Sequence, residues 1–260
     1  MQSLATVATS TSSPTLPLQS SKWSYESSLL YSDLSSRYDV VEDPISLGTC
    51  AFSILRVRDT NALLKEINHE TFVRDERLPY WAELWPSSIE LARYCLKEGG
   101  VCGRRILEIG CGLGLAGVAA ARAGAHVIFT DYEPDALKFA RYNALKNLSP
   151  DCIDSRVKFR LLDWRSDEEV EPVDMIIGAD VVYERRNFLP ILNIVRRVLK
   201  DDGCGVFTDP DRSTGMSFFA LAEQETFAVT LSSHSLLRGE RSSTILLGEL
   251  RLSRRCNEGS

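Results

Sequence analysis

The sequence lacks the patterns that build metal sites and disulfide frameworks. It has only three histidines, which are far apart, and no two of its seven cysteines form a CxxC pair. An odd number of scattered cysteines is typical of a protein from a reducing compartment. We therefore expect no metal site and no disulfide framework.

The sequence also lacks an excess of positive charge and a long apolar run. Its formal net charge is −6 over 260 residues, whereas proteins that bind nucleic-acid phosphates usually carry a basic surface. No apolar run is long enough to cross a bilayer. With 44% apolar and 25% charged residues, the composition is that of a globular protein. We expect neither nucleic acid nor membrane as a partner.

Charge is absent altogether from residues 1–21, which are rich in Ser and Thr. This composition is typical of a flexible tail, which we expect over residues 1–35. A targeting segment is the alternative, although such segments are usually rich in Arg and the first basic residue here is Lys22. We expect a cytoplasmic protein, with organelle import by this tail as the alternative.

Regular patterns begin near residue 37. Residues 37–42 and 51–57 alternate between apolar and polar on either side of Gly48, which indicates a β-hairpin. Residues 59–67 have the pattern of a short helix. We therefore expect a small hairpin and helix extension over residues 36–77, a main domain over residues 78–252, and a tail over residues 253–260.

In the main domain, strand patterns alternate with helix patterns, which predicts a parallel sheet with helices on both faces. The last two strands have no helix between them and should pair antiparallel. The expected fold is a Rossmann-like, doubly wound α/β sheet of seven strands that ends in an antiparallel hairpin. We expect a turn at Asp202-Gly203 and a helix capped by Ser87 or Ser88. The expected strands span residues 105–109, 126–131, 157–164, 173–180, 205–209, 227–231 and 243–250, and the expected helices span residues 88–97, 115–123, 134–146 and 188–199.

A glycine-rich turn lies between the first strand of the main domain and its helix. Glycines allow a ligand to approach the backbone, and the start of the helix offers unpaired N–H groups. Gly112-x-Gly114-x-x-Gly117 matches the dinucleotide fingerprint. S-adenosylmethionine is the other cofactor that such a turn can hold.

Acidic residues decide between these two cofactors. Ligands of open α/β sheets bind beyond the carboxyl ends of the strands, and five strands deliver a carboxylate there. Such an edge repels phosphates and suits the sulfonium and ammonium of S-adenosylmethionine. A dehydrogenase remains a minor alternative. The five carboxylates belong to Glu108, Asp131, Asp163, Asp180 and Asp209.

Chemistry suggests roles for several of these residues. Asp131 can accept hydrogen bonds from both ribose hydroxyls, and Asp163 can accept one from the adenine amino group while Trp164 packs nearby. The glycine backbone would line the methionine part. The candidate cofactor-binding residues of the turn and strand ends are Glu108, Gly110, Cys111, Gly112, Gly114, Asp131, Tyr132 and Asp163.

The segment Glu108-Ile-Gly-Cys-Gly-Leu-Gly114 resembles the first motif of class I S-adenosylmethionine-dependent methyltransferases. More narrowly, residues 78–250 resemble the methyltransferase-16 family of protein-lysine methyltransferases. That resemblance is carried by the Trp-Pro segment at Trp85, by Leu162-Asp-Trp164, and by the D-x-x-Y motif Asp180-Val-Val-Tyr183.

The resemblance implies that Trp85, Trp164 and Ala179 belong to the cofactor site. It implies that Asp180 and Tyr183 lie where the methyl acceptor enters, and they are the candidate catalytic residues. Asp180 would attract the amine, and Tyr183 would desolvate it. Alternatively, Asp180 could cap the next helix through the N–H of Tyr183.

Within the family, two segments are similar to the branch that methylates the electron transfer flavoprotein β subunit. They are Pro79-Tyr-Trp81 and Asp209-Pro-Asp-Arg212, although that branch has Gly where this chain has Asp211. The resemblance implies a methyltransferase that uses S-adenosylmethionine to N-methylate a lysine of a protein, as a monomer or weak oligomer. A small-molecule N-methyltransferase and a non-catalytic binding module are the alternatives. The hairpin could serve the acceptor or cover the cofactor.

Overall fold

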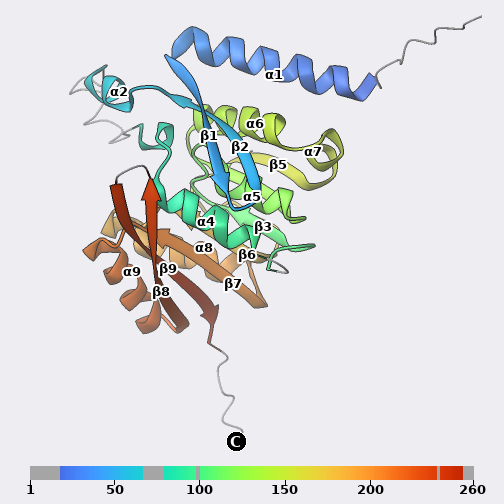
Figure 1. Ribbon diagram of the computed structural model, residues 1–260. Coiled ribbons are helices and arrows are strands. Elements are labelled where there is room, and N and C mark those ends of the chain that lie inside the picture. Colours follow the sequence, from blue (N-terminus) through green and yellow to red (C-terminus); the bar gives the residue numbers. More distant parts are fainter. Residues whose placement is uncertain (1–17, 67–78, 98–99, 239–240, 254–260) are drawn as a thin grey trace, which may run out of the picture.

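A seven-stranded sheet forms the centre of the computed structural model, which describes residues 18–66, 79–97, 100–238 and 241–253 (Figure 1). The strand order is β5-β4-β3-β6-β7-β9-β8, and β9 alone runs antiparallel to the other strands of this sheet. The predicted Rossmann-like fold with an antiparallel C-terminal hairpin is confirmed. The strands are β3 (Arg105–Glu108), β4 (His126–Asp131), β5 (Val157–Leu161), β6 (Val173–Ala179), β7 (Leu199–Asp209), β8 (Phe227–Arg238) and β9 (Arg241–Leu252).

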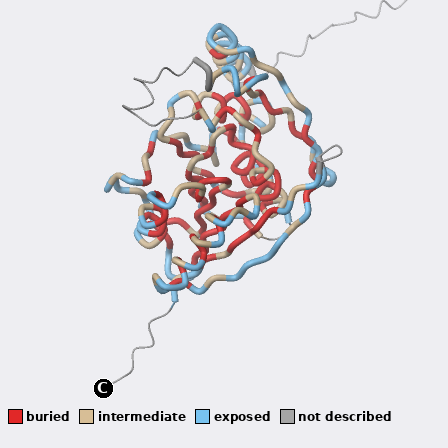
Figure 2. Tube along the Cα trace, turned by 90° about the vertical axis from the view of Figure 1, so that its left-hand side faces the viewer, coloured by how far each residue is buried: buried red, intermediate tan, exposed pale blue. Residues whose placement is uncertain are grey.

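Helices cover both faces of the sheet, because neighbouring strand residues point to opposite sides. Ile106 packs into one hydrophobic cluster and Leu107 into the other. In Figure 2 the buried positions lie along the central strands and the adjoining helices. One cluster includes α4 (Pro86–Leu96), α5 (Leu115–Arg122) and α6 (Pro134–Asn147), and the other includes α8 (Phe188–Val198) and α9 (Ser213–Gln224).

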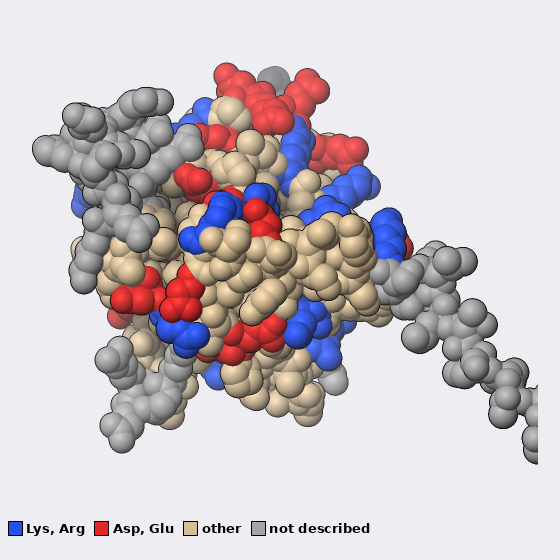
Figure 3. All heavy atoms as spheres, turned by 90° about the horizontal axis from the view of Figure 1, so that it is seen from above, with Lys and Arg blue, Asp and Glu red and all other residues tan. Residues whose placement is uncertain are grey.

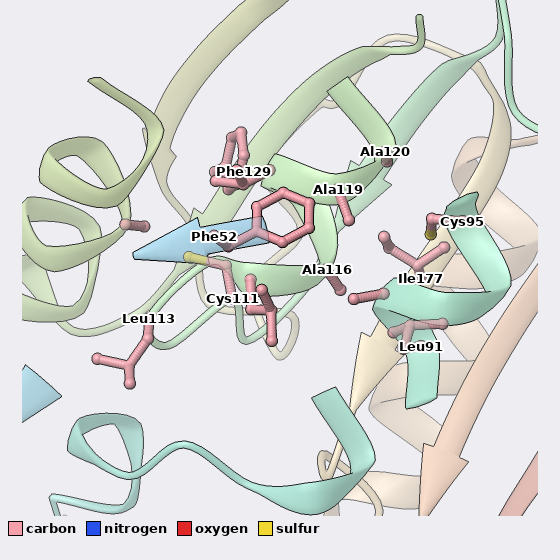
Figure 4. Packing of buried hydrophobic residues seen from close by; sticks show 14 of the residues in the cluster. Phe52, Leu91, Cys95, Cys111, Leu113, Ala116, Ala119, Ala120, Phe129 and Ile177 are labelled. Atoms are coloured by element: carbon pink, nitrogen blue, oxygen red, sulfur yellow. The ribbon is translucent and has the colours of Figure 1, made fainter. Parts of the chain in front are cut away.

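The first cluster joins the hairpin, the helices and the glycine turn into one core (Figure 4). Phe52 comes from the hairpin and Phe129 from β4, while Leu91 comes from α4. Cys111 and Leu113 of the glycine turn pack into the same cluster. Apolar contacts with this cluster therefore hold the glycine turn in place.

The N-terminal extension contains α1 (Leu18–Arg37), β1 (Val40–Leu47), β2 (Cys50–Val57) and α2 (Thr60–Glu66). The predicted hairpin is present. The prediction of a flexible tail through residue 35 is wrong for residues 18–35, which form most of α1. The buried side chain of Leu34, together with Trp23 and Leu30, packs against the core, and this apolar spacing was hidden among serines.

Ion pairs fasten α1 to α6. Arg37 pairs with Asp135, and Lys138 lies 2.8 Å from Asp33. In the view from above (Figure 3), basic and acidic side chains lie close to one another at several places on this face. Exposed pairs contribute little each, so we attribute the docking of α1 mainly to its buried apolar side chains.

The hairpin is also tied to the glycine turn by a buried amide. Asn143 of α6 accepts the N–H of Leu55 at 2.7 Å and donates to the carbonyl of Leu55 at 3.1 Å. Its amide also donates to the carbonyl of Leu113 at 2.9 Å. Because no described hairpin residue lines the main cavity, we interpret the hairpin as a support for α6 and the turn.

Several boundaries differ from the predictions. Helix α4 begins at Pro86 with Trp85 as its N-cap, and Ser88 Oγ donates back to the carbonyl of Trp85 at 2.8 Å rather than capping. Asp202-Gly203 lies inside β7, where the pairing register with β6 shifts. The third predicted strand ends at Leu161 rather than Trp164. Two unpredicted helices are α7 (Pro150–Arg156) and α9.

Two negative findings concern the described residues only. None of their helices combines the length and the apolarity needed to span a bilayer. No cluster of three or more His, Cys, Asp or Glu side chains among them is arranged to hold a metal ion.

A buried leucine tests whether α1 belongs to the folded body. Leu34 is 0% exposed, so Leu34→Ala should lower the free energy of unfolding by about 2–4 kcal/mol through the cavity it leaves. Leu29 lies on the same helix but is 52% exposed, and Leu29→Ala should change stability by at most about 0.5 kcal/mol. Urea unfolding measures both, and equal stabilities of the two variants would show that α1 is not packed as described.

Candidate active site

The turn between β3 and α5 has a backbone that only glycine adopts easily. The φ angles are 50° at Gly112 and 77° at Gly114. A Cβ at Gly112 would lie 3.1 Å from the carbonyl oxygen of Trp81, and one at Gly114 would lie 2.9 Å from the Cβ of Ala140. The turn therefore excludes side chains where the backbone must approach its neighbours.

A cavity of about 690 Å³, including its open mouth, lies above this turn. It is at the carboxyl edge of β3, β4 and β6, where the strand order reverses and where ligands of such sheets bind. The structure brings together in its wall all but one of the candidate residues, namely Trp85, Glu108, Gly110, Cys111, Gly112, Gly114, Asp131, Tyr132, Trp164, Ala179, Asp180 and Tyr183.

Asp163 is the candidate that does not line the cavity. Its carboxylate accepts hydrogen bonds from Nε and Nη2 of Arg165, the shortest at 2.6 Å, and from the backbone N–H of Arg165 at 2.9 Å. Asp163 thus lies beside the wall and is engaged by its own loop. Its contact with adenine stays a prediction.

Some lining residues were not among the candidates. Tyr80 and Trp81 lie in the aromatic segment before α4, whose unusual composition was the available signal. Trp81 also packs on Tyr38 and Phe139, so it serves the core and the cavity together. The other lining residues lie within or beside the glycine turn, the Trp-Pro segment and the D-x-x-Y motif, and they are Glu83, Leu84, Ser88, Leu113, Leu115 and Val181.

Asp131 is fixed by the backbone around it. Its two carboxylate oxygens accept the N–H groups of Gly112 and Glu133, each at 3.0 Å. Burial nevertheless raises its pKa to about 6, so it is mainly ionised at neutral pH. Each carboxylate oxygen can accept a further hydrogen bond, and the residue can therefore hold neighbouring hydroxyls of a ligand.

Glu108 is the most unusual group in the wall. It is 3% exposed, and its Oε2 is buried without a hydrogen-bond partner among the described residues. Burial raises its pKa to about 8, despite a hydrogen bond from the backbone of Gly117. A buried acceptor without a partner is costly, and an ammonium group or a water bound in the cavity would satisfy it. This fits the amino group of S-adenosylmethionine.

Three aromatic rings, those of Tyr80, Trp85 and Tyr183, form part of the cavity wall. Trp85 Nε1 donates to the carbonyl of Tyr80 at 2.8 Å. The ring of Tyr80 meets those of Trp85 and Tyr183 edge to face, at 6.2 and 5.6 Å between centroids. Burial raises the pKa of Tyr183 above its ordinary value, so its hydroxyl stays protonated. This wall can exclude water from an entering side chain.

Asp180 lies beside these rings in a left-handed conformation with φ 59°. Ser87 Oγ donates to its Oδ2 at 3.3 Å, and Arg212 Nη2 forms an ion pair with its Oδ1. The carboxylate of Asp180 does not cap the next helical turn, as the alternative prediction had it. That turn, η2 (Arg185–Asn187), has Glu184 as its N-cap. The carboxylate is instead held toward the cavity by side chains from other elements.

Replacing Glu108 by glutamine tests the buried acid through pH. Because its pKa is about 8 in the folded protein and near 4.3 when unfolded, the folded state binds the extra proton. The unfolding free energy therefore falls as the pH rises. Glu108→Gln removes this dependence, so from pH 5 to pH 8.5 wild type should lose on the order of 3 kcal/mol relative to the variant.

Urea unfolding across this pH range measures the difference. Glu223→Gln, at an exposed position on α9, is the control and should follow wild type at every pH. A difference between wild type and Glu108→Gln that does not change with pH would contradict the buried, protonated acid.

Comparisons with known proteins agree with this geometry. A family model described as lysine methyltransferase matches residues 75–225. The protein N-lysine methyltransferase METTL21A of Xenopus tropicalis is 34% identical over 144 residues, which cover 54% of this chain and 66% of that protein. The electron transfer flavoprotein beta subunit lysine methyltransferase of Danio rerio is 36% identical over 110 residues, which cover 41% of this chain and 40% of that protein. The chain thus spans less than two thirds of the length of either relative.

The fold is also similar to that of solved structures. The crystal structure of a ribosomal protein L11 methylase from Lactobacillus delbrueckii subsp. bulgaricus superposes with a TM-score of 0.51 at 18% identity, covering 65% of this chain and 81% of that one. That likeness concerns the fold alone. The family model covers more than half of the 260 residues, and the glycine turn, Asp131 and the D-x-x-Y residues surround one cavity. The chain belongs to the lysine methyltransferase family, a group of S-adenosylmethionine-dependent methyltransferases.

Proposed function

We propose that this protein transfers a methyl group from S-adenosylmethionine to the side-chain amine of a lysine in a protein substrate. The observation that carries the proposal is the shared cavity. Its wall combines the glycine turn and Asp131 with Asp180 and Tyr183. Donor and acceptor can therefore meet in one enclosed space, which in-line methyl transfer requires.

The chain's own residues account for holding the cofactor. Asp131 would accept the ribose hydroxyls, and the unpartnered Oε2 of Glu108 would accept the amino group of the methionine part. Trp164, whose buried Nε1 lacks a partner among the described residues, would pack beside the adenine. S-adenosylmethionine would supply an electrophilic methyl group on its sulfonium. No phosphate is present to be repelled by the acidic wall.

The lysine that accepts the methyl group must first become a neutral amine. The carboxylate of Asp180 would orient the incoming ammonium, and the rings of Tyr80, Trp85 and Tyr183 would strip water from it. Desolvation lowers the pKa of a lysine, so a larger fraction becomes the nucleophilic free amine. The proton would leave to solvent at the cavity mouth.

A protein substrate is also supported by the relatives, whose names assign lysine methylation to them. We further propose that the protein acts as a monomer or weak oligomer without nucleic acid, in keeping with its net charge of −6. A cytoplasmic location is proposed because the described cysteines are all free, as a reducing compartment would keep them.

Labelling of a cell lysate tests the proposed reaction. Incubation with radiolabelled S-adenosylmethionine should label at least one protein band, and mass spectrometry should place the methyl group on a lysine. Asp180→Asn and Tyr183→Ala should each lower the labelling rate at least about tenfold with unchanged cofactor affinity, because the carboxylate that orients the amine or the ring that excludes water is lost. Asn tolerates the left-handed backbone at position 180.

Tyr31→Ala is the matched control, because Tyr31 is an exposed tyrosine of α1 and its replacement should leave labelling unchanged. Wild-type rates in both site variants would remove the roles of Asp180 and Tyr183. Label found only in small molecules would instead favour an N-methyltransferase of metabolites.

Asp131 offers a separate test of the cofactor site. Asp131→Ala should weaken S-adenosylmethionine binding by roughly 2–4 kcal/mol, since two hydrogen bonds to a charged acceptor are lost. Asp131→Asn keeps the shape and one acceptor oxygen, and its loss should be smaller. Calorimetric titration measures both, and wild-type affinity in Asp131→Ala would refute the ribose assignment.

A further inference from the structure

A positive charge of the chain itself, on Arg212, is paired with Asp180 of the cavity wall. Nη2 of Arg212 forms an ion pair with Oδ1 of Asp180 and lies 3.3 Å from Oδ2 of Asp209. The side chains of the two acids are 6% and 0% exposed, whereas that of Arg212 is 38% exposed. A partly exposed side chain thus pairs with two buried carboxylates.

The guanidinium does not fit this position well. Nε and Nη2 of Arg212 and Oδ2 of Asp209 make no hydrogen bond of regular geometry with the described residues. The donors of a guanidinium are fixed in a plane, whereas an ammonium carries three donors that rotate about a slender chain. A lysine ammonium could therefore bind the same carboxylates in place of the guanidinium.

Arg212 can leave this position without disturbing the sheet. Its backbone N–H donates to Oδ1 of Asp209 at 3.0 Å, so the main chain stays anchored at the end of β7 whichever way the side chain turns. The preceding residue, Asp211, has a left-handed φ of 50° and is exposed. The side chain of Arg212 is partly exposed, so part of it already contacts solvent.

Charge also favours the entry of a cation. Asp180 and Asp209 supply two carboxylates to one guanidinium. Burial raises the pKa of Asp209 to about 6, so it is mainly ionised at neutral pH. The cluster is then net negative, and a cation approaching Asp180 gains attraction that a neutral side chain does not.

We propose that Arg212 occupies, before substrate binds, the place beside Asp180 that the ammonium of the acceptor takes, so that the acceptor binds by exchange of one cation for another. This inference rests on the proposed lysine acceptor. It makes Arg212 a residue that selects the acceptor, because only a cationic side chain can replace it at Asp180. After exchange, the Arg212 side chain turns to solvent.

The chemistry after exchange is that of any amine acceptor. The ammonium first gives one proton to water. The nitrogen lone pair then forms the new N–C bond, and the electron pair of the breaking C–S bond stays on sulfur. The products are S-adenosylhomocysteine and a methylated ammonium, so charge and electrons balance.

The variant R212K tests the exchange without knowledge of the substrate. It places a primary amine at the position of the guanidinium, so the variant should methylate itself. Purified R212K incubated with S-adenosylmethionine should gain methyl groups at position 212, located by peptide mass spectrometry, while wild type gains none there. The rate per molecule should not change with protein concentration, because the reaction is intramolecular.

R185K is the matched control. Arg185 is an exposed arginine that donates to Ser217 Oγ at 3.3 Å rather than to Asp180, and the introduced lysine should stay unmethylated. Thermal melting and calorimetric cofactor binding verify that both variants are folded.

A second variant measures the exchange as binding. In the presence of S-adenosylhomocysteine, n-butylammonium serves as a probe for the lysine side chain. R212M removes the competing cation and should bind the probe about three- to tenfold more tightly than wild type, the range expected for release from one partly exposed ion pair. Equal or weaker binding in R212M would overturn the exchange.

The outcomes separate this inference from the proposed function. If wild type methylates a lysate protein while folded R212K stays unmodified, the exchange is overturned and the proposed function stands. If wild type labels no lysate protein and R212K also stays unmodified, both are overturned. Methylation at position 212 supports the placement of Arg212 at the acceptor site.

Discussion

The path of the main chain between β3 and α5 is the constraint on which the rest of the structure depends. Left-handed backbone at Gly112 and Gly114 brings β3 and α5 close together without a side chain between them. Asp131 accepts the N–H of Gly112, while Asn143 donates to the carbonyl of Leu113. Strand β4 and helix α6 thus hold the turn from two sides, and the floor of the cavity is rigid before any ligand arrives.

Burial at the carboxyl edge of the sheet gives this cavity its chemistry. The pKa values of Glu108, Asp131 and Asp209 are all raised, and in each case removal from water is the main cause. Acids held in this way favour ligands that bring hydroxyl donors or positive charge. The aromatic rings of the cavity wall can instead exclude water. A sulfonium donor and an amine acceptor meet both demands in one enclosure.

The N-terminal extension contributes to the site indirectly. It lies before the segment that matches the family model, which begins at residue 75. Helix α1 packs along α6, and the hairpin hydrogen-bonds to the same helix through Asn143. Because α6 follows directly on the strand that carries Asp131, the extension supports the element next to the carboxylate for which ribose binding is proposed. These contacts account for the described residues of the hairpin. A role for the hairpin as a lid over the cofactor or as a surface for the acceptor is not needed to explain them.

The sequence by itself determined the order of strands and helices, the glycine turn and the acidic strand ends, because these follow from local periodicity and from residue types at fixed spacing. It also determined the family, through short motifs that each lie on one loop. It did not reveal α1, whose apolar positions are diluted by serine, or the end of the third strand. Only the tertiary structure decided that Asp163 pairs with Arg165 beside the cavity, and that Arg212 pairs with Asp180. The first pair joins near neighbours in one loop, and the second joins residues far apart in the chain. In both cases the folded path of the backbone decides which charge a side chain faces, and the residue types alone do not record that path.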